Sequence, residues 1–116
     1  MSGANLTEDT LLGFPPLIKS QQEEILTALD EVEKKNVEVK EIVASFNSQI
    51  NANPALKNAE QRTVELKAKM AASAEYTVNN DLLIGLRLDA ETKKIHLEYL
   101  QNMFRAHLAI VSGGNR

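Results

Sequence analysis

The feature that most constrains the fold is a run of apolar residues at seven-residue spacing between residues 17 and 50. Two such rows form the a/d seam of a coiled-coil helix. The first row is Ile18, Ile25, Val32, Val39 and Phe46. The second row is Gln22, Leu29, Asn36, Val43 and Ile50. No glycine or proline interrupts residues 17–52, so the helix should be roughly 50 Å long at about 1.5 Å per residue. A chain of 116 residues cannot cover so long a helix, which favours a role in an assembly.

Prolines and asparagines delimit this helix. Pro15 and Pro16 predict a turn or an extended segment, with Pro16 suited to the first position of a helix. In "NANP", Asn51 is expected in the left-handed conformation that ends helices, and Pro54 opens a second helix. Because this connection is short, the second helix is expected to fold back antiparallel, which gives an αα-hairpin.

Residues 82–100 are the most apolar stretch and have two interpretations. As two strands around a loop at 90–93, they separate into one apolar and one polar face. The apolar pairs would be Leu88 with Ile95, Leu86 with Leu97 and Ile84 with Tyr99. We favour this β-hairpin.

The alternative is one continuous helix over 54–111, which "DAETKK" (89–94) supports because it lacks the residues of a tight turn. A helix that is apolar on two opposed faces must be sandwiched, and so short a chain offers little to cover both. The two faces would be Ile84, Leu88, Ile95, Tyr99, Ile110 and Leu83, Leu86, Leu97, Phe104, Leu108.

The predicted fold is therefore mainly α, with a minor β part, in a single domain. Its elements are an N-terminal arm (1–16), a long helix (17–51), a second helix (54–77), a β-hairpin (82–100) and a short C-terminal helix (101–111).

Composition argues against catalysis. There is no cysteine, so neither disulfides nor thiolate metal sites can form. The two histidines, His96 and His107, complete no metal-binding motif, and no glycine-rich phosphate loop is present. We therefore expect no enzyme, no cofactor, no metal and no small-molecule substrate.

Charge and hydropathy restrict the classes of partner and the location that we expect for this chain. A net charge of −3 makes a nucleic-acid-binding regulator the least favoured function, because such surfaces are normally basic. The apolar run Leu82 to Leu88 is far shorter than the ~20 residues of a membrane helix. The N-terminal residues lack the pattern of a signal peptide. We expect a soluble intracellular protein, with the cytoplasm as its location.

The leading hypothesis is a non-catalytic interaction or assembly subunit that joins a homo- or hetero-oligomer through its coiled-coil hairpin. The alternative is a small chaperone or regulator that binds a partner segment through residues 82–111. Asn36, at a seam position, either specifies the pairing of helices or is simply solvated at the edge of the seam. The expected interface comprises Ile18, Ile25, Leu29, Val32, Asn36, Val39, Val43, Phe46, Ile50, Ile84, Leu86, Leu88, Ile95, Leu97 and Tyr99.

Overall fold

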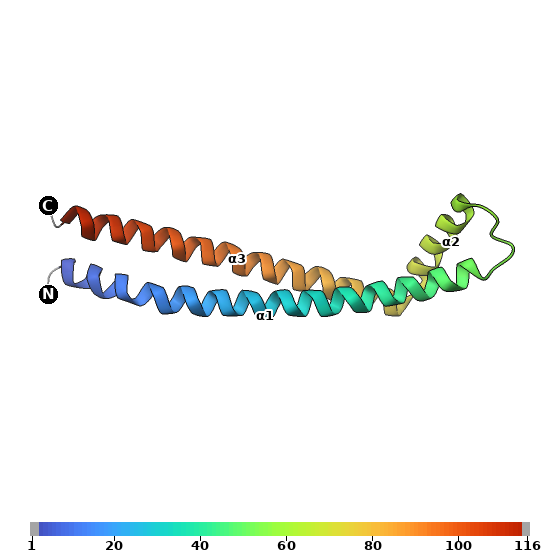
Figure 1. The fold of residues 1–116 in the computed structure, drawn as a ribbon, viewed down its shortest axis with the longest axis horizontal. Helices are drawn as coiled ribbons and strands as arrows, with labels where there is room; N and C mark the ends of the chain where they lie inside the picture. Colours follow the sequence, from blue (N-terminus) through green and yellow to red (C-terminus); the bar gives the residue numbers. More distant parts are fainter. Residues whose placement is uncertain (1–2, 115–116) are drawn as a thin grey trace. The chain divides into compact units, whose positions relative to one another are not determined.

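The computed structural model describes the backbone of residues 3–114 and the side chains of residues 11–113. Within these residues it contains three helices, α1 (Gly3–Asn51), α2 (Ala59–Ala72) and α3 (Ala74–Gly114), and no strand (Figure 1). The chain forms two compact units. Unit 1 comprises Met1–Leu29 and Leu88–Arg116, and unit 2 comprises Asp30–Arg87.

Unit 1 is an antiparallel pair of helical segments, one from α1 and one from α3, which Figure 1 shows side by side. The ring of Phe14 lies 5.9 Å from that of Phe104 and 5.2 Å from that of His107, between centroids. About two turns further along α1, Gln21 Nε2 donates a hydrogen bond of 2.9 Å to the carbonyl oxygen of Lys93. The core of unit 1 contains Phe14, Ile25, Ala28, Ala90 and Leu100.

Unit 2 combines the second part of α1 with α2 and the first part of α3. Val39, Ile50 and Leu83 are its buried apolar residues. Ile50 borders a hollow of about 250 Å³ together with residues of α2 such as Leu66. Lys69 Nζ of α2 donates to Gln49 Oε1 of α1 at 3.3 Å, so α2 packs beside the end of α1.

The predicted break at Pro15 and Pro16 is wrong, because α1 runs through both prolines. Each proline lacks the N–H that would bond the carbonyl four residues earlier, at Leu11 and Leu12, and this normally weakens a helix. Phe14 is buried at this level against α3. Tertiary burial of its ring therefore offsets the local cost, and residues 1–16 do not form a separate arm over the described part.

The second boundary is only partly as predicted. Helix α1 does end at Asn51, but no described residue has a positive φ, so the left-handed cap is wrong. Helix α2 begins at Ala59 and not at Pro54. Asn58 supplies the cap, since its side-chain oxygen accepts a hydrogen bond of 2.8 Å from the backbone N–H of Gln61.

The predicted β-hairpin at 82–100 is also wrong, since these residues and the expected C-terminal helix (101–111) all belong to α3. The all-α alternative is closer, but its continuous helix over 54–111 is interrupted at Ser73. There the backbone is extended, with φ −89° and ψ 112°. Ser73 Oγ accepts from the N–H of Tyr76 at 3.0 Å and so caps the start of α3.

Candidate protein interface

One face of α3 packs against α1 within each unit and carries two rows of residues at seven-residue spacing. We call these the inner rows. All their members are buried or half-buried, and they include Ala90, Asn79 and Lys93 as well as large apolar residues. The first row is Tyr76, Leu83, Ala90, Leu97, Phe104 and Val111. The second row is Asn79, Leu86, Lys93, Leu100 and His107. This regular period explains why residues 82–100 are helical, because a heptad face is what an opposing helix covers.

In unit 1, the α1 row against α3 lies one residue earlier than the sequence predicted. Gln21 is 8% exposed and Ala28 is 4% exposed, whereas Gln22 and Leu29 lie in solvent. The small side chain of Ala28 allows close approach of the helices, and the amide of Gln21 is satisfied by Lys93. Apolar character alone favours Leu29 over Ala28 as the residue that faces α3, so the sequence prediction missed the row that contains Ala28. The signal that marks it is Phe14, Gln21 and Ala28 at spacing seven.

The opposite face of α3 carries a second apolar row that no described part of the chain covers. We call it the outer stripe and restrict it to unit 1. Its members are Leu88, Thr92, Ile95, Tyr99, Asn102, Ala106 and Ile110, all of which are exposed. The four large apolar side chains have exposed fractions of 68% (Leu88), 65% (Ile95), 56% (Tyr99) and 61% (Ile110).

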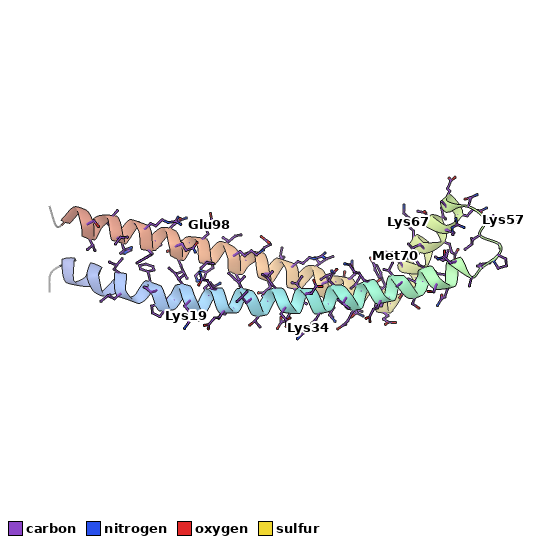
Figure 2. All side chains as sticks on the ribbon, viewed as in Figure 1. Lys19, Lys34, Lys57, Lys67, Met70 and Glu98 are labelled. Atoms are coloured by element: carbon purple, nitrogen blue, oxygen red, sulfur yellow. The ribbon has the colours of Figure 1, made fainter. Side chains whose placement is uncertain are left out.

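The spacing of the outer stripe is that of a helix-packing face. Steps of three and four residues separate successive members, with a four-residue step at the end, and none of the members is charged. In Figure 2, the labelled Glu98, which neighbours Tyr99 in the chain, points away from α1. Contiguous apolar surface of this kind marks interaction sites on soluble proteins more often than single exposed residues do.

Polar groups on the outer stripe have partners within α3. Thr92 Oγ1 donates to the Leu88 carbonyl at 2.9 Å. Asn102 Oδ1 accepts from Arg105 Nη1 at 3.1 Å. The rings of Tyr99 and His96 are nearly parallel at 6.2 Å. Because the Thr92 hydroxyl and the Asn102 side-chain oxygen are hydrogen-bonded locally, covering the stripe would not leave these two groups unsatisfied.

The exposed face of α1 in unit 1 differs from the outer stripe. Leu12 and Leu26 are also strongly exposed, but Lys19 stands between them at the same seven-residue spacing and Glu33 follows. Figure 2 shows Lys19 pointing away from α3. The apolar residues of this α1 face are therefore isolated by charges, as is normal for a solvated helix.

One edge of the outer stripe carries charges of both signs. Glu91 and Glu98 lie toward the N-terminal part of this edge and Arg105 lies toward the C-terminal part. Glu91 Oε1 accepts from Lys94 Nζ at 3.2 Å. The edge is thus acidic at one end and basic at the other.

The residues predicted for the interface fall into three groups. Ile25, Val39 and Ile50 are buried; Ile18, Val32, Asn36, Val43, Phe46, Leu86 and Leu97 are half-buried; and Leu29, Ile84, Leu88, Ile95 and Tyr99 are exposed. The structure does not bring the six hairpin residues together, because Leu86 and Leu97 belong to the inner rows. Leu88, Ile95 and Tyr99 belong to the outer stripe, whereas Thr92, Asn102, Ala106 and Ile110 were absent from the predicted set.

In unit 2, α1 and α3 are joined by polar contacts. Lys35 Nζ donates to Asn79 Oδ1 at 3.1 Å and to Glu38 Oε2 at 2.7 Å. Arg87 Nη2 donates to Asn36 Oδ1 at 3.4 Å. Asn36 is thus half-buried with a cross-helix partner. Lys34 is paired with Asp30 at 2.9 Å, and this hydrogen bond raises the pKa of Lys34 above its usual value.

Unit 2 also has an acidic hollow of about 320 Å³, lined by Glu38, Glu41 and Glu75 with apolar Phe46. Among the side chains of residues 11–113, no three histidine, cysteine or acidic groups converge so as to hold a metal ion. In the same part of the chain, no helix has both the length and the apolar character required to cross a bilayer.

These features make the outer stripe the strongest candidate for a binding surface on the described chain. Searches of protein-family models, of curated proteins and of solved structures find no match to this chain.

Proposed function

We propose that this chain is a non-catalytic interaction or assembly subunit, and that the outer stripe of α3 is its docking face. The observation that carries the proposal is the uncharged, exposed apolar row on the side of α3 opposite α1 in unit 1. The inner rows already account for the packing of α3 within the chain. The outer stripe is surplus to that packing, and its cover would have to come from another chain.

The spacing of the stripe favours a helix as the element that docks. Residues separated by three and four positions present knobs that fit between the residues of a facing helix. Full burial of a single Leu or Ile side chain is worth about 1.5–3 kcal/mol. Tyr99 can add a large rigid contact with a polar tip, which is typical of interface centres.

The proposal can be tested by photo-crosslinking in cells that produce the protein. A photoreactive phenylalanine analogue replaces Tyr99 in one variant and Leu26 in a matched control. Leu26 is as exposed as the stripe residues and also lies in unit 1, but it sits on the charged face of α1.

We expect a discrete crosslinked species with the analogue at position 99 and none at position 26. Adding Ile95→Lys should remove the crosslink, whereas Leu26→Lys should leave it unchanged. No product at position 99, or equal products at both positions, would contradict the proposal. Crosslinks from position 99 to many unrelated proteins would instead favour the small chaperone alternative.

A further inference from the structure

We propose that the occupant of the outer stripe is a second copy of this chain, whose α3 lies antiparallel across the stripe with the two-fold axis at the level of Leu97. This inference rests on the proposed function of the stripe and adds the identity and orientation of the partner. The inference rests on which side chains of the stripe and of its charged edge would face each other when a second copy runs in the opposite direction.

The apolar match concerns two layers on each side of the axis. In this arrangement, Ile95 of one copy faces Tyr99 of the other, and Leu88 faces Ala106. The large side chain of Leu88 is therefore opposite a small one, as close helix packing requires. Because the interface is isologous, each contact occurs twice.

The polar match concerns Thr92 and Asn102, which face each other across the same axis. Thr92 Oγ1 gives its proton to the Leu88 carbonyl, so its lone pairs can accept a hydrogen bond from the Asn102 amide of the second copy. The two polar residues of the stripe would thus satisfy one another, and neither would be placed against an apolar side chain.

The charges on the edge distinguish orientations. In an antiparallel pair, equivalent edges of the two helices face each other, which places Glu91 opposite Arg105 twice. In a parallel pair, the edge with Glu91 would face the opposite edge of the second copy. That opposite edge carries Asp89, His96 and Met103, which include no lysine or arginine to pair with Glu91 or Glu98.

Glu98 fixes the position of the axis. It lies on the same edge, midway between Glu91 and Arg105, and would face its own copy across the axis. A shift of one heptad would pair Glu98 with Arg105, but it would leave Leu88 uncovered and place Tyr99 against Asn102. The proposed position keeps the apolar layers and accepts one like-charge contact.

Sedimentation equilibrium on the purified full chain at low salt measures the dimer dissociation constant. We expect Glu91→Lys and Arg105→Glu each to weaken the dimer on the order of tenfold, because two symmetry-related pairs are reversed. The double variant should return to within about twofold of the wild-type chain. Glu98→Gln should tighten the dimer a few-fold by removing the like-charge contact.

Glu24→Lys is the matched control, because it makes the same change in net charge on an exposed position of α1 in unit 1. It should leave the dissociation constant unchanged. Circular dichroism on every variant checks that loss of the Glu91–Lys94 pair has not unfolded α3.

A wild-type chain that stays monomeric at high concentration overturns this inference. If crosslinking at position 99 then captures a different protein, the proposed function still holds. A dimer in which the double variant fails to recover, or in which Glu98→Gln weakens association, overturns the antiparallel position proposed here.

Discussion

The buried hydrogen bond of Gln21 in unit 1 allows a prediction of sign, because two substitutions at this position should shift stability in opposite directions. The amide donates to the Lys93 carbonyl at 2.9 Å. That carbonyl lies inside α3 and also accepts the N–H of Leu97, four residues later in the helix. Removing the glutamine amide therefore leaves no orphaned acceptor.

The expected changes in the free energy of unfolding can be derived from the groups that each substitution removes or adds. Gln21→Leu loses a neutral hydrogen bond worth about 0.5–1.5 kcal/mol net. It gains the burial of a leucine side chain of similar size, worth about 1.5–3 kcal/mol. We expect a net stabilisation of about 1 kcal/mol. Gln21→Ala loses the same hydrogen bond and also about 0.8 kcal/mol for the one buried methylene group that it removes, so it should destabilise by about 1–2 kcal/mol.

Urea unfolding gives the measurement. The chain contains two tyrosines and no tryptophan, and Tyr99 lies in unit 1 whereas Tyr76 lies in unit 2. In a Tyr76→Phe background, tyrosine fluorescence therefore reports on unit 1. With an m-value of about 2 kcal/mol/M, the midpoint should rise by about 0.5 M for Gln21→Leu.

Self-association would raise apparent stability by mass action, so the titration is repeated at two protein concentrations. Refutation would be a Gln21→Leu variant that is destabilised as much as Gln21→Ala. That result would mean the amide contributes more than the one hydrogen bond to Lys93.

Other substitutions test the remaining parts of the fold by chemical unfolding. Phe14→Ala removes a buried ring from unit 1 and should destabilise it by about 3–5 kcal/mol; a loss below about 1 kcal/mol would mean that this burial does not support α1 through its prolines. Gly85→Ala should stabilise unit 2 by about 0.5–1 kcal/mol, since the position is helical and a Cβ meets no atom within 4 Å; destabilisation would contradict an open position. Ser73→Ala should cost about 1 kcal/mol through loss of the α3 cap, while Ser73→Asp should retain most of that stability; equal losses would exclude the capping role.

The sequence was sufficient to place helix over 17–51 because the heptad rows there are long and uninterrupted. It was insufficient at Pro15 and Pro16, where the local cost is visible in the sequence but the compensating burial of Phe14 against α3 is not. The helix that packs against α1 in unit 1 was also predicted wrongly. Packing there is between α1 and α3, which no short connection could have indicated.

The error at 82–100 has a specific cause. Residues four apart lie on one face of both a strand and a helix, so Ile84 and Leu88, or Ile95 and Tyr99, fit either structure. Ala90 and Lys93 distinguish the two, because they complete the inner rows of α3 at spacing seven. A small residue and a charged residue were not expected in a core. The two opposed apolar faces described for the helical alternative are present in α3, one of them largely in the inner rows and the other largely in the outer stripe.

The contact between Lys35 and Asn79 has a consequence for folding kinetics. Heptad rows are nearly invariant when one helix slides seven residues along another, so slipped isomers are potential kinetic traps for unit 2. A slip of this kind would place the half-buried ammonium of Lys35 against Leu86 or Ala72 in place of the Asn79 oxygen. The pair with Glu38 lies within α1 and would persist, but loss of the cross-helix acceptor beside an apolar side chain is costly for a half-buried ammonium. A contact worth little in the correctly folded state therefore penalises its nearest misfolded competitors.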